Sequence, residues 1–185
     1  MTTGSTGTVD RPIALNSIDD LASHALEMLT NHDVVALVHG DAHLRNILLR
    51  NTREPVLVDF ANAGPGHPLF DFVRLELGIW TVLLRQTDRK VAQTLVAKLL
   101  ARETIDSEVT ISFKRRGPAI EVALQSSVLI RESCRAVARG DASWFDQYRS
   151  MHGLLALLAL RRPADHYLSF AVFSAVESAP HAVAV

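Results

Sequence analysis

The chain has 185 residues, of which 48% are hydrophobic and 21% are charged, and its formal net charge is −1. This length and composition predict one globular domain with a core of its own. The near-zero charge gives no electrostatic reason to expect nucleic acid or an anionic membrane as the main partner. The single cysteine, Cys134, excludes an internal disulfide and suits a reducing cytoplasm.

The first twelve residues are rich in Thr, Gly and Ser and predict a disordered tail, so that residues 13–185 form the domain. The tail has no apolar segment of the kind found in a signal peptide. The longest uninterrupted apolar stretch, Leu154–Leu160, is too short to span a bilayer. We therefore expect a cytoplasmic protein.

A helix is predicted from Ser17 to about Thr30. Ser17 is a suitable N-cap, two acids follow it in the first turn, and apolar residues recur at helical spacing. Two Val-rich runs come next, Val34–Val38 and Val56–Val58, and both predict short buried strands.

Each run leads into a polar cluster that contains an aspartate, Asp41 in the first and Asp59 in the second. An uncompensated carboxylate beside a buried strand costs free energy, so both side chains are expected to have a charged partner or a metal ion.

After Asp71 the pattern is helical almost to the end of the chain. Helices are predicted from Phe72 to Leu84, to about Arg102, to about Gly140, to about Arg161 and around Phe170–Val176. Cys134 lies in one of these patterns and is expected to be a small core residue. One exception is Val109–Phe113, whose alternating pattern predicts a short strand or an extended loop. The cations 114–116 that follow are interpreted as a solvated face, with the holding of an anionic substrate as the alternative.

The stretch from Val34 to Asp71 carries a resemblance to a known family. The runs HGDAHLRNILL and VLVDFANAGPGHPLFD resemble the core of the aminoglycoside phosphotransferase and choline kinase superfamily. The resemblance covers about 40 residues. It consists of H-x-D-x-x-x-x-N, then an apolar run with an Asp-Phe pair, then a Gly/Pro loop with a further Asp.

The resemblance implies a role for each matching residue. Asp41 would be the catalytic base, and Asn46 and Asp59 would hold Mg²⁺. His39 and Asp71 would structure the loop, and His43 and Arg45 would be neighbours of a phosphate or substrate. The implied reaction is Mg²⁺-dependent phosphoryl transfer from ATP (or GTP) to a small-molecule hydroxyl, and the sequence does not identify this acceptor.

The implied fold is α+β and mainly α, the C-terminal lobe of a protein-kinase-like phosphotransferase, with short strands that carry the catalytic loop. We expect the family's preceding β-rich lobe to be absent from this chain, because about 33 residues precede Val34 and they contain no Gly-rich phosphate loop or strand lysine. We therefore expect the lone chain to be inactive and a separate chain or domain to supply that lobe. The alternative is a catalytically degenerate lobe that serves as a binding or regulatory module of a larger signalling protein.

A second interpretation of His39-x-Asp41-x-His43 is a metal site made of two imidazoles and a carboxylate. A metallophosphoesterase of this kind would need further Asp, Asn and His clusters downstream. None follows in the required form, so the phosphotransferase interpretation is favoured.

Overall fold

The computed structural model describes residue 23, residues 34–51, 53–113 and 116–159, and residues 169, 171, 172, 175 and 176. The predicted tail lies outside these residues. So do nearly all of the helix predicted from Ser17 and most of the helix predicted around Phe170. Within the described residues the fold is mainly helical α+β, with five α-helices and two small antiparallel sheets.

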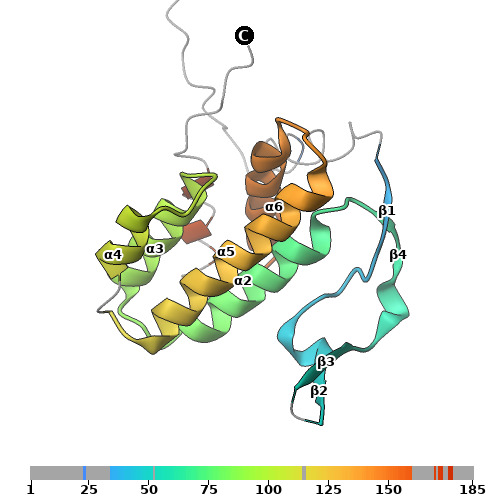
Figure 1. Cartoon of the computed structure of the whole chain (residues 1–185), viewed down its shortest axis with the longest axis horizontal. Helices are drawn as coiled ribbons and strands as arrows, with labels where there is room; N and C mark the ends of the chain where they lie inside the picture. The colour runs from blue at the N-terminus through green and yellow to red at the C-terminus, as the bar shows by residue number, and fades with distance from the viewer. Residues whose placement is uncertain are drawn as a thin grey trace, which may run out of the picture.

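The helices form one packed group (Figure 1). They are α2 (Phe70–Leu84), α3 (Arg89–Leu100), α4 (Ser107–Phe113), α5 (Pro118–Ala138) and α6 (Trp144–Ala159). Helix α2 lies against both α5 and α6, and α4 lies against α3 and α5. The five helices agree with the helical periodicity of the sequence, except at α4. In the described part of the chain, no helix has the length and apolarity that crossing a membrane requires.

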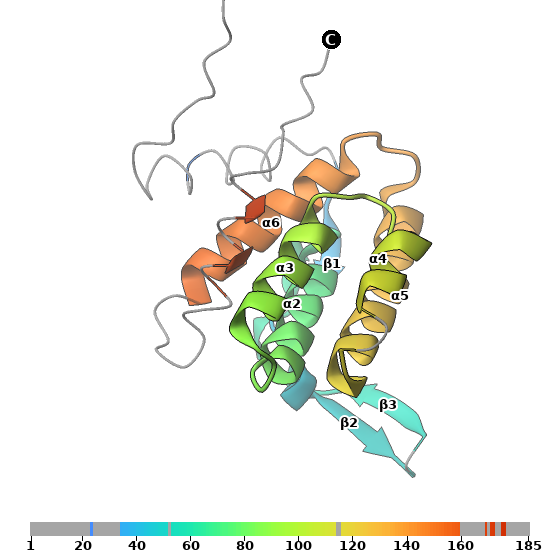
Figure 2. The ribbon, with the colours of Figure 1, turned by 90° about the vertical axis from the view of Figure 1, so that its left-hand side faces the viewer.

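Each sheet has two strands. Strand β1 (Ala36–Val38) pairs with β4 (Gly64–Gly66), and β2 (Ile47–Arg50) pairs with β3 (Glu54–Leu57) in a hairpin. The short 3₁₀ helices η1 (Leu44–Asn46) and η2 (Phe60–Asn62) connect the two sheets. The β2–β3 hairpin projects away from the helices in both views (Figures 1 and 2).

The hydrophobic core lies among the helices. Its largest side chain, Trp80 of α2, is fully buried, and its indole N–H donates to Ser127 Oγ on α5 at 2.9 Å. Cys134 is also fully buried among core residues, as its place in the pattern predicted. The core of an α-helical group is built from one apolar stripe per helix, and the periodicity of these stripes is what the sequence displays.

The strand or loop predicted at Val109–Phe113 is wrong, because these residues belong to helix α4. Val109 and Phe113 are buried four residues apart, on one side of a helix, whereas Ile111 is 69% exposed. The Asp106 carboxylate also accepts a hydrogen bond from the Val109 N–H at 3.0 Å. Five residues are too few to distinguish the alternation of a strand from the periodicity of a helix. Packing against α3 and α5 selects the helix.

The two Val-rich runs form strands, but the prediction that these strands are buried is wrong. In β1 only Val38 is buried, and Leu37 is 84% exposed. All four residues of β3 are exposed. An apolar run indicates a buried strand only when other strands or helices cover it, and each of these sheets has two strands.

Candidate functional site

The candidate site is the loop that follows β1, and a side chain in the first turn of α2 holds its backbone. The Asp71 carboxylate, in the first turn of α2, accepts from the backbone N–H groups of His39 at 2.6 Å and Gly40 at 3.0 Å. His39 is buried, and its Nε2 lies 2.9 Å from the carbonyl oxygen of Val58. Together these contacts join the loop to α2 and to the end of β3.

Gly40 allows this loop to pass close to η2. Its φ is +78°, in the region that favours glycine, and a Cβ there would collide with the carbonyl oxygen of Asn62. A residue with a side chain would therefore not fit at this position, immediately before Asp41.

Asp41 is paired with a cation that the sequence analysis did not single out. Arg74, one turn along α2 from Asp71, forms an ion pair and hydrogen bond with Asp41 Oδ1. His43 Nε2 lies 3.6 Å from Asp41 Oδ2, and the Asp41 side chain is 22% exposed. The expectation of a charged partner or a metal for Asp41 is met by Arg74.

Asn46 and Asp59, the predicted metal ligands, lie in different surroundings. Asn46 is buried, and its amide donates to the backbone oxygen of Asp41 at 3.0 Å, so it braces the loop. Asp59 is exposed and left-handed (φ +66°) where β3 leads into η2. No group of three or more His, Cys, Asp and Glu side chains in the described residues could hold a metal. The assignment of Mg²⁺ and a nucleotide to these residues stays a prediction.

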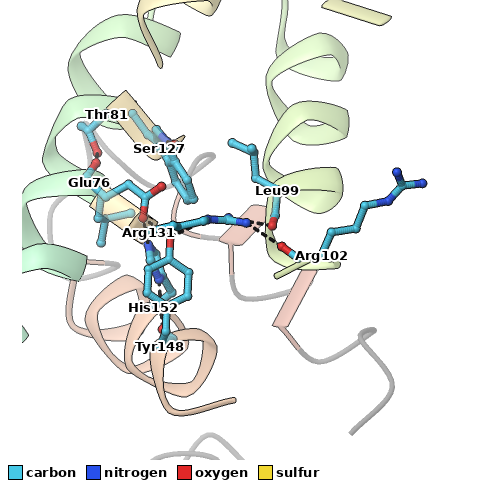
Figure 3. Close-up of polar contacts among 10 residues, drawn as sticks. Glu76, Thr81, Leu99, Arg102, Ser127, Arg131, Tyr148 and His152 are labelled. Carbon is cyan, nitrogen blue, oxygen red and sulfur yellow. Dashed lines mark hydrogen bonds and ion pairs between the residues drawn. The ribbon is translucent and has the colours of Figure 1, made fainter. Parts of the chain in front are cut away.

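A second polar cluster, which the sequence analysis missed, lies inside the helical core (Figure 3). Glu76 of α2 is 0% exposed; it accepts a hydrogen bond from the Tyr148 hydroxyl and lies 3.3 Å from His152 Nε2. Tyr148 and His152 both belong to α6. Arg131 of α5 completes the cluster, because its Nε donates to the Tyr148 oxygen at 3.2 Å.

Arg131 also connects this cluster to the end of α3. Its two terminal nitrogens donate to the backbone oxygens of Leu99 at 2.7 Å and Arg102 at 2.5 Å (Figure 3). The last carbonyls of a helix have no partner within the helix, so this guanidinium satisfies groups that burial would otherwise leave unpaired. One side chain thereby joins α5, α6 and the C-terminal end of α3.

The charges in the cluster are mutually compensated. Burial raises the pKa of Glu76, but the hydrogen bond and charge of His152 and the charge of Arg131 lower it more, so the net pKa lies below its ordinary value of 4.5. Burial raises the pKa of Tyr148 well above its ordinary value. Glu76 is therefore ionised and Tyr148 neutral at pH 7. Because Glu76, Arg131 and Tyr148 are all buried, the cluster acts as a connection between helices and not as an open site.

A weak sequence signal for this cluster existed. Glu76 occupies the apolar face of α2 one turn before Trp80, and Arg131 lies one turn before Cys134 in the stripe of α5. A charged residue inside an apolar stripe is expected to have a buried partner. The sequence does not show which residues pair, because Glu76 and Tyr148 are 72 positions apart.

One protein-family model matches the chain: "Ternary complex associated domain 9" (TCAD9) covers residues 5–161. The chain belongs to the TCAD9 family. No curated protein and no solved structure gives a significant match.

This match corrects the sequence-based identification. The TCAD9 match includes the whole stretch from Val34 to Asp71 on which the phosphotransferase resemblance depended, and no kinase family matches. The predicted kinase function, and its alternative as a degenerate kinase-like lobe, are therefore wrong. The physical reason is that His39, Asn46 and Asp71 make contacts that hold the loop in shape. A loop held by these contacts needs the same residue types at the same spacing whether or not it catalyses phosphoryl transfer.

Proposed function

We propose that this TCAD9 chain is a protein-binding module that takes part in a multi-protein assembly through its β2–β3 hairpin. The observation that carries the proposal is the exposure of apolar side chains on both faces of this hairpin. Leu48 is 54% exposed and Leu49 is 65% exposed, and successive residues of a strand point to opposite faces. The family description, association with a ternary complex, supports the same function.

The register places an apolar pair on each face. Leu48 lies opposite Val56 on one face, and Ile47 lies opposite Leu57 on the other. An antiparallel sheet in a stable domain normally packs one of its faces on a core. A two-stranded hairpin by itself is marginally stable in water. Burial of these apolar pairs against a partner would therefore favour binding.

The partner we infer is a protein segment in extended conformation that adds a strand to the hairpin. Among the described residues, β2 and β3 pair with each other and with no third strand, so each has a backbone edge open to pairing. Added strands gain main-chain hydrogen bonds along such an edge and place alternate side chains on the apolar faces. The main-chain hydrogen bonds would provide affinity, and the alternate side chains would fix the register of the added strand.

The test compares Leu48→Lys with Leu129→Lys. Leu129 is an equally exposed leucine on α5, at 63%, so neither change removes a core contact. The tagged full chain and both variants are expressed in the source cells, and the proteins that co-purify in stoichiometric amounts are then produced and recombined in purified form. We expect native mass spectrometry to detect an assembly with two further chains, which is lost with Leu48→Lys and kept with Leu129→Lys.

Two outcomes would contradict the proposal. One is a reconstituted assembly that Leu48→Lys leaves intact, because the hairpin would then not be the contact. The other is a purified chain that associates only with a second copy of itself through the same leucine.

A further inference from the structure

A cavity of about 290 Å³ lies next to the loop that carries Asp41. Its walls come from η1, from the middle of α2 and from the end of α6. This volume is at the small end of the range for ligand pockets, roughly 300–1,000 Å³. The described residues that line it include three basic side chains (His43, Arg45, Arg74) and five apolar ones (Leu44, Leu77, Val82, Leu155, Leu158).

The polar end of the cavity is cationic. Arg45 and Arg74 both line it, and none of its described lining residues is Asp or Glu. The ion pair with Asp41 compensates the charge of Arg74, whereas Arg45 forms no ion pair with the described residues and contributes its positive charge at the rim.

Two nitrogen atoms of the residues at this end lack a hydrogen-bond partner among the described residues. Arg74 Nε and His43 Nδ1 are shielded from solvent and have no hydrogen-bond partner there. These two nitrogens are covered by protein atoms, so the exposed guanidinium of Arg45 is the donor that a ligand oxygen in the cavity can reach. An arginine N–H also forms its strongest hydrogen bonds with carboxylate or phosphate oxygens.

The other end of the cavity is apolar. Leu77 and Leu155 are buried and form its floor, whereas Val82 and Leu158 are at least half exposed and border its mouth. Leu77 and Val82 belong to α2, and Leu155 and Leu158 to α6, so the apolar end lies between these two helices. A cavity with basic side chains at one end and aliphatic walls at the other fits a ligand that has an anionic group and an aliphatic chain.

We propose that this cavity binds a small amphipathic anion, with a phosphate or carboxylate head group and a short aliphatic tail. The head group binds beside the guanidinium groups of Arg45 and Arg74. The tail lies between α2 and α6. The proposal is independent of partner binding at the β2–β3 hairpin, because it uses a different surface and different residues.

The experiment is isothermal titration calorimetry of the full chain with four probes, each below its micelle-forming concentration. They are octyl phosphate, octanoate, inorganic phosphate and 1-octanol. We expect one or both of the two-part anions to bind at least about tenfold more tightly than inorganic phosphate or octanol, because each of these lacks one of the two interactions. Comparing octyl phosphate with octanoate then distinguishes a phosphate head group from a carboxylate.

Two variants test the two ends of the cavity without touching the core. Arg45→Gln should weaken binding by about three- to tenfold and reduce its salt dependence, since Arg45 is an exposed rim charge. Leu158→Asp places a negative charge beside the tail and should weaken binding by at least about tenfold. The matched controls, Arg53→Gln and Leu129→Asp, change exposed residues outside the cavity and should leave the affinity unchanged.

The proposal is overturned if none of the probes binds, or if octanol binds as tightly as the anions. It is also overturned if both variants bind the anions with the affinity of their controls. Circular dichroism of each variant shows that the fold is retained, so that weaker binding can be assigned to the cavity.

Discussion

At the scale of single residues, Asp71 joins the loop after β1 to helix α2. Its two carboxylate oxygens accept from two successive backbone N–H groups, those of His39 and Gly40. These groups lie in a partly buried loop, where an unpaired N–H costs free energy because water cannot satisfy it. The loop that positions Asp41 therefore depends on a residue 30 positions later in the chain.

We expect Asp71→Ala to lower the free energy of unfolding by about 1–3 kcal/mol, because two backbone donors lose their acceptor. Urea denaturation followed by circular dichroism measures this change. Glu132→Ala, which alters an exposed acid on α5, is the control and should change stability by less than about 0.5 kcal/mol. Equal stability of the two variants would show that the loop does not need its carboxylate.

At the scale of elements, helix α3 is stabilised at each end by a side chain, one from the residue just before it and one from another helix. Asp88 immediately precedes the helix and caps its N-terminus. Its carboxylate accepts hydrogen bonds from the N–H groups of Lys90 and Val91 at 3.0 and 3.1 Å. Arg131, from α5, donates to carbonyls at its C-terminal end. The first contact is local and visible in the sequence as an acid before a helix, whereas the second needs the tertiary structure.

Asp88→Ala should therefore destabilise the protein by about 1 kcal/mol, the usual loss of an N-cap side chain. Asp88→Asn should retain most of the stability, because its amide oxygen can accept the same two hydrogen bonds. Thermal unfolding of the three proteins by differential scanning calorimetry makes the comparison. If Asn proved as damaging as Ala, the charge of Asp88 and not its cap geometry would be responsible.

At the scale of the whole molecule, the Glu76 cluster connects four helices with one buried network. The pKa of Glu76 is lowered in the folded state, so the folded protein holds this proton less tightly than the unfolded chain does. The resulting stabilisation is complete above the ordinary pKa of 4.5, which the unfolded chain retains, and is lost as the pH falls through the lower folded value.

We expect Glu76→Gln to reduce the free energy of unfolding at pH 7 by about 1–3 kcal/mol, since Arg131 and His152 lose a buried charged partner. The difference between wild type and variant should shrink as the pH is lowered below about 4. Urea unfolding of both proteins between pH 3 and pH 7 tests this. A difference that stayed constant across that range would mean that the ionisation of Glu76 contributes nothing to stability.

Cys134 reports on the opening of the whole core. Its thiol is fully buried, and burial raises its pKa to about 12, so the thiolate that reacts with disulfide reagents is almost absent in the folded protein. We expect labelling by Ellman's reagent at pH 8 to be slow in buffer and to accelerate with urea, in parallel with unfolding measured by circular dichroism. Fast labelling in buffer would indicate local opening of α5.

The sequence by itself determined α2, α3, α5 and α6, because their apolar stripes repeat over three or more turns and no competing period fits so long a pattern. Periodicity is a local property, and so are the Asp88 cap and the place of Cys134 in its stripe. The sequence also indicated a strand at each of the two Val-rich runs, β1 and β3, but it did not predict β2 or β4.

Only the tertiary structure decided which surfaces are covered and which charges meet. The short pattern at Val109–Phe113 became a helix through packing, and the apolar hairpin stayed exposed because none of the described helices covers it. Arg74 reaches Asp41 across 33 positions, and Tyr148 reaches Glu76 across 72. A sequence motif states which residue types are near one another along the chain. The free energy of a buried charge depends on its neighbours in space, and these are set by the packing of α2 against α5 and α6.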